Sequence, residues 1–221
     1  MVSSTYRKIQ SLTFRSLIMI LMTAVMSTVC LLPVMAQDEG PSPIPEGLQG
    51  WKEGQFTVTR TGTATQGTMK MTTTVRTEVT GRTQDSISTK TTTTLMNKMD
   101  IQGREVITKS TTTVDTTMDF GAQLMTTSTS STTDGMTSGP FETQLPLDMS
   151  KLPQPAADAK APDFKVESIT TPAGTFECRV YTFGEGSMAT KTYMCPEMVP
   201  FGGFVKTKGP GVEVTLIECG N

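Results

Sequence analysis

The chain contains no histidine, one tryptophan and three tyrosines among its 221 residues, and charged residues make up only 18% of it. The lack of histidine excludes an enzyme or a metal site that depends on imidazole. The 19 basic and 21 acidic residues nearly balance, which excludes a nucleic-acid binder with a basic footprint. The composition also excludes a coiled coil and a polytopic membrane protein, and nothing in it calls for a cofactor.

Threonine is the abundant residue, with 42 copies. Its β-branch restricts χ1 in the extended chain, and its hydroxyl is tolerated on either face of a half-solvated sheet. Leu, Ile, Val and Phe form about 17% of the chain after residue 36, a level at which disorder becomes an alternative. A Ser/Thr-rich exposed stalk is the other alternative, but stalks are usually Pro-rich and residues 51–137 contain no proline.

Residues 1–36 have the pattern of a signal peptide, because Arg7, Lys8 and Arg15 precede an apolar run from Leu17 to Met35. Val34-Met35-Ala36 ends in a small residue, so we expect cleavage after Ala36. An uncleaved anchor and lipid attachment at Cys30 are the alternatives, and all three predict an exported protein, periplasmic or extracellular. Cleavage takes the net charge from −2 to −5, because the three basic residues leave, and the mature chain is predicted to have no transmembrane span.

Alternation with period two predicts a series of strands after a flexible linker at residues 37–50. Between Met69 and Val79, the apolar residues and alternate threonines share one parity, and Val106 to Phe120 repeats the pattern strongly. Phe56 with Val58 and the run from Ile87 to Leu95 repeat it more weakly. Residues 126–138 lose the alternation and are predicted to be a ragged edge strand or a loop.

Prolines punctuate residues 138–163, which we predict to be a connection with a short helical turn near Ala156 to Lys160. Four more strands are predicted after it, at Phe164–Thr170, Thr175–Phe183, Ala189–Cys195 and Val212–Cys219. Residues 51–221 are therefore expected to form a single β domain, with Thr-rich strands at 51–137, the Pro-rich connection at 138–163 and C-terminal strands at 164–221. An interdomain linker at the connection is the alternative.

The segment Thr171-Pro172-Ala173-Gly174-Thr175 predicts a three-residue hairpin with a bulge, in which Gly174 takes a positive φ. This "PAGTF-x-C" hairpin, with the later Val199-Pro200-Phe201-Gly202-Gly203-Phe204-Val205-Lys206 turn, resembles uncharacterised exported bacterial β-proteins. The resemblance covers the C-terminal third. More weakly, the pattern is similar to the lipoprotein-carrier type of fold, and this resemblance implies a curled antiparallel sheet whose concave face holds a lipid or a protein segment.

Three cysteines remain after residue 36, and an exported protein favours a disulfide between two of them. If the turn between the two flanking strands centres near Gly186, Cys178 and Cys195 lie opposite one another, so we favour that bridge. A bridge from either of them to Cys219, and three free thiols, are the alternatives. A cysteine nucleophile is disfavoured because no histidine is present to lower the thiol pKa.

Other chemical interpretations are weaker. Met194, Cys195 and Met198 could form a soft Cu(I) site, and so could Met96 with Met99, but methionine more often fills gaps in a sparse core. Asp115, Asp119 and Glu105 could form a carboxylate site, although on a strand they share a solvated face. An outer-membrane barrel would need aromatic girdles, and one tryptophan and three tyrosines are too few to form them. We therefore expect neither a metal site nor an enzyme.

The expected fold is mainly β: an antiparallel sheet of about eight strands, curled as a half-barrel or sandwich, with a Pro-rich connection and little helix. The expected function is non-catalytic binding of an apolar ligand, a lipid or an extended segment of an envelope protein on the concave face. The residues expected to line that face are Met69, Met71, Val75, Val79, Val114, Met118 and Phe120. The alternative is a structural or surface-associated interaction protein without a small ligand.

Overall fold

A computed structural model describes residues 44–62, 64–66, 69–147 and 163–220. Contacts divide the chain into residues 1–33, which lie outside the described residues, and a compact unit of residues 34–221. The expected signal peptide and the helical turn at Ala156–Lys160 also lie outside the described residues.

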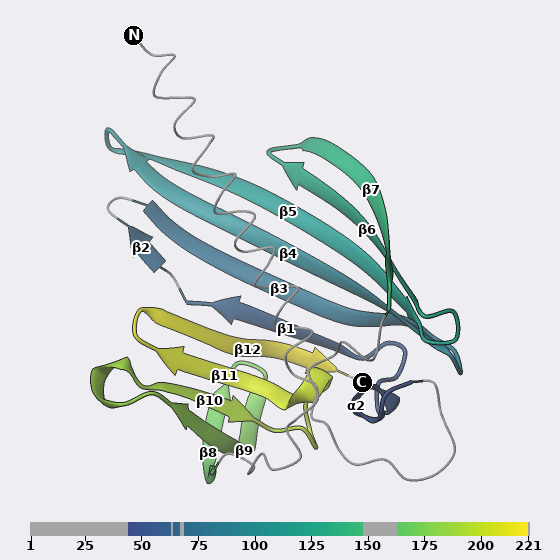
Figure 1. The fold of residues 1–221 in the computed structure, drawn as a ribbon. Helices are drawn as coiled ribbons and strands as arrows, with labels where there is room; N and C mark the ends of the chain where they lie inside the picture. Colours follow the sequence, from purple (N-terminus) through teal and green to yellow (C-terminus); the bar gives the residue numbers. More distant parts are fainter. Residues whose placement is uncertain (1–43, 63, 67–68, 148–162, 221) are drawn as a thin grey trace. The chain divides into compact units, whose positions relative to one another are not determined.

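The fold is mainly β, as the alternation predicts: the strands form one antiparallel sheet, and it does not close into a barrel (Figure 1). Its order is β7-β6-β5-β4-β3-β1-β12-β11-β10-β9-β8, and β2 pairs with β3. The N-terminal strands are β1 (Phe56–Thr61), β2 (Ala64–Gln66), β3 (Met69–Arg82), β4 (Ser86–Ile101), β5 (Arg104–Asp119), β6 (Leu124–Thr133) and β7 (Met136–Pro146). The C-terminal strands are β8 (Lys165–Thr171), β9 (Gly174–Phe183), β10 (Thr190–Met194), β11 (Phe204–Gly209) and β12 (Val212–Gly220).

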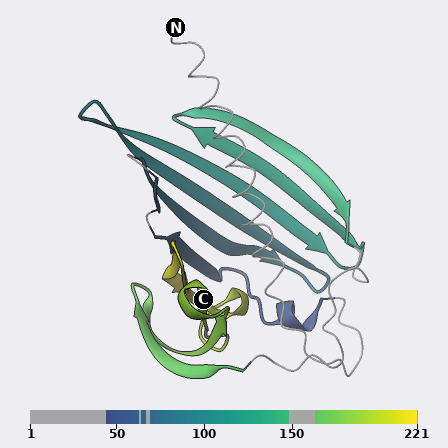
Figure 2. The same cartoon turned by 60° about the vertical axis from the view of Figure 1, so that its left-hand side comes forward.

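Two antiparallel meanders make up this sheet. The first contains β1 to β7 and the second contains β8 to β12, and the ladder between β1 and β12 joins them. Figure 2 shows the long strands of the first meander as a continuous layer. The β1–β12 register runs from Phe56 opposite Gly220 to Thr61 opposite Val214. Strands distant in sequence therefore lie at the centre of the sheet, while β7 and β8 form its two edges.

The structure has more strands than the sequence pattern predicted. Residues 126–138, predicted to be a ragged edge strand or a loop, belong to the β6–β7 hairpin, whose register shifts between Thr129 and Ser131. β7 extends through Pro140 to Pro146, into the expected connection. The sequence pattern also does not predict β11, because the Val199–Lys206 segment has the composition of a turn. The "PAGTF" hairpin is tighter than expected, since Thr171 pairs directly with Gly174, which has a φ of 141°.

The expected linker at 37–50 ends in folded structure. Helix α2 (Glu46–Gln49) follows Pro45, and Ile44 and Leu48 are buried because they are the apolar residues of this short segment. Arg82 at the end of β3 holds the helix, since its guanidinium donates hydrogen bonds to the backbone oxygens of Leu48 (3.0 Å) and Trp51. The Leu48 oxygen belongs to the last turn of the helix, where carbonyl groups lack intrahelical donors, and it also accepts the Trp51 N–H at 3.1 Å.

A compact core lies in the C-terminal half. Phe176, Cys178, Cys195, Val199, Val205 and Leu216 are buried together, and Ile169, Tyr193 and Cys219 pack against them. Two short 3-10 turns, η2 (Gly186–Met188) and η3 (Phe201–Gly203), flank β10. Gly203 closes the second one: its φ is 83°, and a Cβ there would lie 2.2 Å from the Pro196 nitrogen. Only glycine fits this approach of two backbone segments.

Candidate ligand-binding face

The ladder registers bring the expected lining residues to one face of the first meander. Val75 lies opposite Thr93, which lies opposite Thr112, and Val79 lies opposite Thr89 and then Thr116. Because residues of one parity share a face, Met69, Met71, Val114 and Met118 lie on this face as well. Phe120 follows the end of β5, is buried, and donates its N–H to the Asp85 oxygen at 2.8 Å.

Charge is distributed unequally between the two faces of β3 to β7. On the face that holds Val75, charged side chains occur only at the ends, where Arg82 lies opposite Ile87 and Arg104 lies opposite Ile101. We call the region between these pairs the uncharged face. The charged side chains of these strands otherwise lie on the opposite face: Lys70, Arg76, Glu78, Lys90, Lys98, Asp100, Glu105, Lys109, Asp115, Asp119 and Glu142.

The charged face is a solvated surface. Lys90 and Asp115 form an ion pair at 3.6 Å, Lys98 and Glu105 one at 3.3 Å, and Arg76 and Glu78 one at 3.0 Å, all with substantially exposed side chains. Such pairs contribute little to stability. They keep one side of a long sheet soluble, as the sequence pattern at Asp115 and Asp119 predicted.

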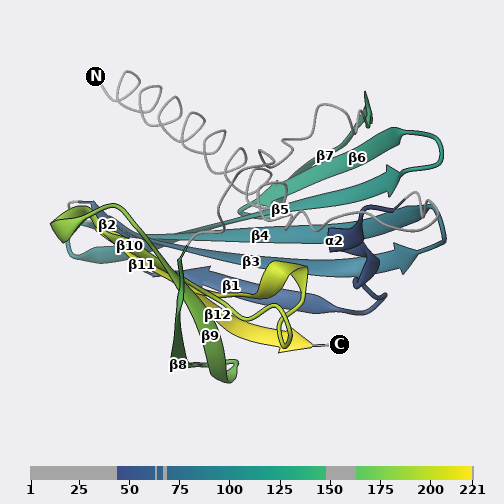
Figure 3. The same cartoon turned by 60° about the horizontal axis from the view of Figure 1, so that its bottom comes forward.

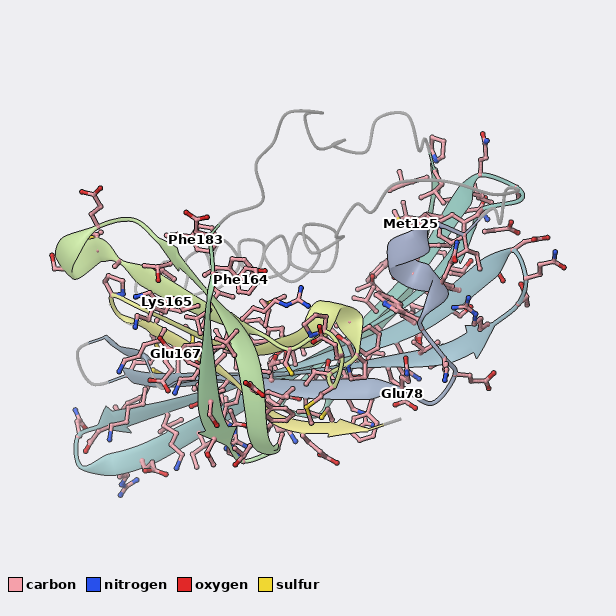
Figure 4. The ribbon with its side chains drawn as sticks, turned by 90° about the horizontal axis from the view of Figure 1, so that it is seen from below. Glu78, Met125, Phe164, Lys165, Glu167 and Phe183 are labelled. Carbon is pink, nitrogen blue, oxygen red and sulfur yellow. The ribbon has the colours of Figure 1, made fainter. Side chains whose placement is uncertain are left out.

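Helix α2 marks the side on which the uncharged face lies, because Arg82, which binds the helix, shares its face with Ile87. In Figure 3, β6 and β7 turn out of the plane of β3 and β4 toward this side. Figure 4 labels one residue from each face, Met125 on the uncharged face and Glu78 on the charged one. The uncharged face is therefore on the concave side of the bend.

Three pairs of hydroxyl groups on the uncharged face bind each other. Thr77 and Thr91 share a hydrogen bond of 3.4 Å, and the hydroxyls of Ser110 and Thr133 share one of 2.9 Å. Ser131 and Ser138 do the same at 2.8 Å. These six hydroxyls make fewer demands on a ligand because they already have a hydrogen-bond partner.

Asn97 is an amide residue on this face that the sequence pattern did not single out. It lies opposite Met71 on the uncharged face, and its side-chain oxygen is buried without a hydrogen-bond partner among the described residues. A buried acceptor without a donor is costly.

The uncharged face also continues onto strands that the sequence analysis did not assign to it. Met118 lies opposite Met125 on β6, which lies opposite Leu145 on β7, and Thr129 lies opposite Phe141. Phe141 is 66% exposed and Met136 is 77% exposed. Phe141, Thr143 and Leu145 alternate in the sequence as in a strand. Because prolines flank them, the sequence pattern favoured a connection here instead.

The expected disulfide is absent, and Cys178, Cys195 and Cys219 are free thiols. The β9–β10 register pairs Met194 with Arg179, so one step further Cys195 lies opposite Cys178, as the turn position predicted. Cys195 Sγ instead donates to the Glu177 oxygen at 3.2 Å. Burial raises the pKa of Cys178 to about 12, with the neighbouring Cys195 contributing, and burial also raises the pKa of Cys195 and of Cys219. Thiols held neutral in this way are poor nucleophiles.

Comparisons of the chain with protein-family models, with curated proteins and with solved structures found no match. The resemblance to exported bacterial β-proteins therefore stays a prediction. Among the described residues, no helix has both the length and the apolar character needed to cross a membrane.

Proposed function

We propose that the chain is a non-catalytic exported protein whose uncharged face binds an apolar ligand, of which the acyl chain of a lipid is the best match. The observation that carries this proposal is the separation of charge between the two faces of one sheet. An evenly solvated sheet would have no physical reason to exclude ions from one side only. A face that a hydrocarbon covers does have one, since an unpaired charge beneath it would be desolvated.

The chemistry of the face fits a flexible apolar chain better than a compact polar molecule. Apolar groups lie at both ends, with Met69 opposite Met99 near one end and Met118 opposite Met125 near the other. Threonine methyl groups connect them along β4 and β5. Each methylene removed from water stabilises a complex by about 0.8 kcal/mol, so an extended acyl chain can bind without any ion pair.

Two neighbouring threonines on β4 give a matched test. Thr93 lies on the uncharged face opposite Val75, and Thr94 lies on the charged face opposite Thr74, and both are half-buried. With a fluorescent fatty acid as probe, Thr93→Lys should weaken binding at least tenfold, because it desolvates an ammonium group under the acyl chain. Thr94→Lys should leave the dissociation constant within about twofold, since its ammonium group remains in water.

A second measurement uses the protein purified from its own host. Native mass spectrometry should show a bound lipid that denaturation releases. Absence of a bound lipid, together with no shift in melting temperature across a panel of lipids, contradicts the proposal. Equal loss of probe binding in the Thr93→Lys and Thr94→Lys variants would show that the binding is unrelated to the uncharged face.

A further inference from the structure

Among the described strands, β7 pairs only with β6, and its other edge has an unusual pattern of hydrogen-bonding groups. The Leu147 N–H donates to the Gln123 oxygen at 2.7 Å, and the β6–β7 register continues from this pair through Leu124 opposite Pro146. Because alternate residues of an antiparallel strand direct their backbone groups to opposite sides, Thr143 and Leu145 bond to β6. Glu142 and Gln144 therefore direct their N–H and C=O groups outward, away from the sheet.

Prolines end this row of outward groups on both sides. Pro140 and Pro146 have the same parity as Glu142 and Gln144, and a proline has no N–H to offer. Between the prolines, the free donors are the N–H groups of Glu142 and Gln144. Every residue of β7 is exposed, so the edge is open to a partner.

The segment between the prolines is a palindrome by residue class. Pro140-Phe141-Glu142-Thr143-Gln144-Leu145-Pro146 repeats the order proline, apolar, polar on either side of Thr143. A second copy related by a two-fold axis at Thr143 would place Glu142 opposite the other copy's Gln144 and Phe141 opposite its Leu145. The prolines of the two copies would face each other at the ends, where neither can donate.

We propose that β7 is a dimerisation strand, and that two copies of the chain pair antiparallel edge to edge around Thr143. In this register Glu142 and Gln144 of each copy exchange both of their backbone hydrogen bonds with the other copy, which uses every free N–H of the segment. The two carboxylates avoid one another, since each faces an amide. Phe141, which is 66% exposed, and Leu145, which is 46% exposed, gain an apolar partner.

The two-fold register favours a second copy over an unrelated extended peptide. An unrelated strand could use any register on a row of free groups, and nothing in its recognition would need a palindrome. A two-fold axis requires one, because each residue must suit its own symmetry-related partner. Pairing also extends the sheet so that the uncharged faces of both copies lie on the same side, since Phe141 and Leu145 belong to that face.

The first test changes the charge at Gln144, an exposed side chain on the charged face. In sedimentation equilibrium with the full chain, the wild-type protein should form a reversible dimer. Gln144→Glu places two pairs of carboxylates opposite each other and should weaken the dimer at least tenfold. Gln144→Lys pairs each lysine with Glu142 of the other copy and should tighten the dimer at low salt, with the gain lost at high salt. A monomeric wild type, or variants that shift in the same direction, would overturn the proposal.

The second test fixes the register. Thr143→Cys should form an intermolecular disulfide under mild oxidation by oxidised glutathione, because the two substituted side chains face each other across the axis at about 5 Å. Thr137→Cys lies six residues away on the same exposed strand, which separates the two copies of the thiol by about 40 Å, and it should not cross-link. Equal cross-linking at both positions would indicate random collision and reject this register.

Discussion

The ring of Trp51 meets the ring of Phe201 edge to face, with centroids 4.7 Å apart and planes inclined by 77°. Trp51 follows α2 near the start of the described chain, and Phe201 lies in η3 between β10 and β11. This contact joins the segment that Arg82 anchors to the C-terminal core, where Val199 is buried two residues before Phe201.

Phe201→Ala should therefore loosen the α2 segment. The aromatic pair contributes about 0.5–1.5 kcal/mol beyond the apolar area it buries, so we expect a loss of about 1–3 kcal/mol of unfolding free energy. Trp51 is the only tryptophan, which makes its emission a direct readout. The emission should shift to the red and become quenchable by acrylamide. Phe164→Ala, at an exposed ring that contacts Tyr181 and Arg179, should leave the emission unchanged.

Gly203→Ala should be among the most damaging single substitutions. Its Cβ would lie 2.2 Å from the Pro196 nitrogen and 2.4 Å from the Cys195 carbonyl carbon, both backbone atoms, and φ is 83°. We expect a loss of more than about 3 kcal/mol by urea denaturation. Gly211→Ala is the control, because its φ is 71° but no atom lies within 4 Å of the new Cβ. Its cost should remain near 1 kcal/mol, and equal losses at the two positions would contradict the steric explanation.

The pair of Lys206 and Glu213, at 2.6 Å, should give the stability a small dependence on pH. The hydrogen bond from Lys206 lowers the pKa of Glu213 below its ordinary value of 4.5. The stabilisation is thus present above pH 4.5 and is lost as the pH falls through the lower pKa of the folded state. Since Glu213 is 45% exposed, Glu213→Gln should cost less than about 1 kcal/mol at pH 7 and nothing near pH 2. Lys206→Met should give the same profile, whereas a cost that persists at pH 2 would indicate packing.

The buried thiols should resist alkylation in the folded protein. Burial raises the pKa of Cys178 to about 12, and both Cys178 and Cys195 are at most 2% exposed. At pH 8, iodoacetamide should modify neither until urea unfolds the chain, after which peptide mass spectrometry should find Cys178, Cys195 and Cys219 all modified. A Cys178–Cys195 peptide pair that stays unmodified without reductant would show that the purified protein carries the bridge.

The sequence pattern predicted the long strands because their side chains alternate over many residues. Val75 and Val114 obey the same parity in sequence and lie on the same face in the sheet. The pattern failed where one residue breaks the alternation: the register shift between Val79 and Gly81 reverses the parity at the end of β3, so Arg82 joins the uncharged face.

Other parts of the structure could not be predicted from local patterns. The two prolines of β7 suggested a loop. At Pro146, however, the backbone nitrogen faces away from β6, so the proline removes no hydrogen bond from the β6–β7 ladder. The pairing of β1 with β12 depends on residues about 150 positions apart, which no local pattern records. The burial of the Asn97 oxygen likewise depends on the β3–β4 register, which places Met71 opposite Asn97.

The β1–β12 ladder also determines the order in which the molecule can assemble. Apart from this ladder, the strands pair with near neighbours in sequence, so each meander can form soon after its own residues are synthesised. β1 must wait for β12, which is made after all the other strands. During that interval the growing chain exposes the edge of β1, and closing the ladder late is the step at which a slow-folding chain is most vulnerable to pairing with a neighbour.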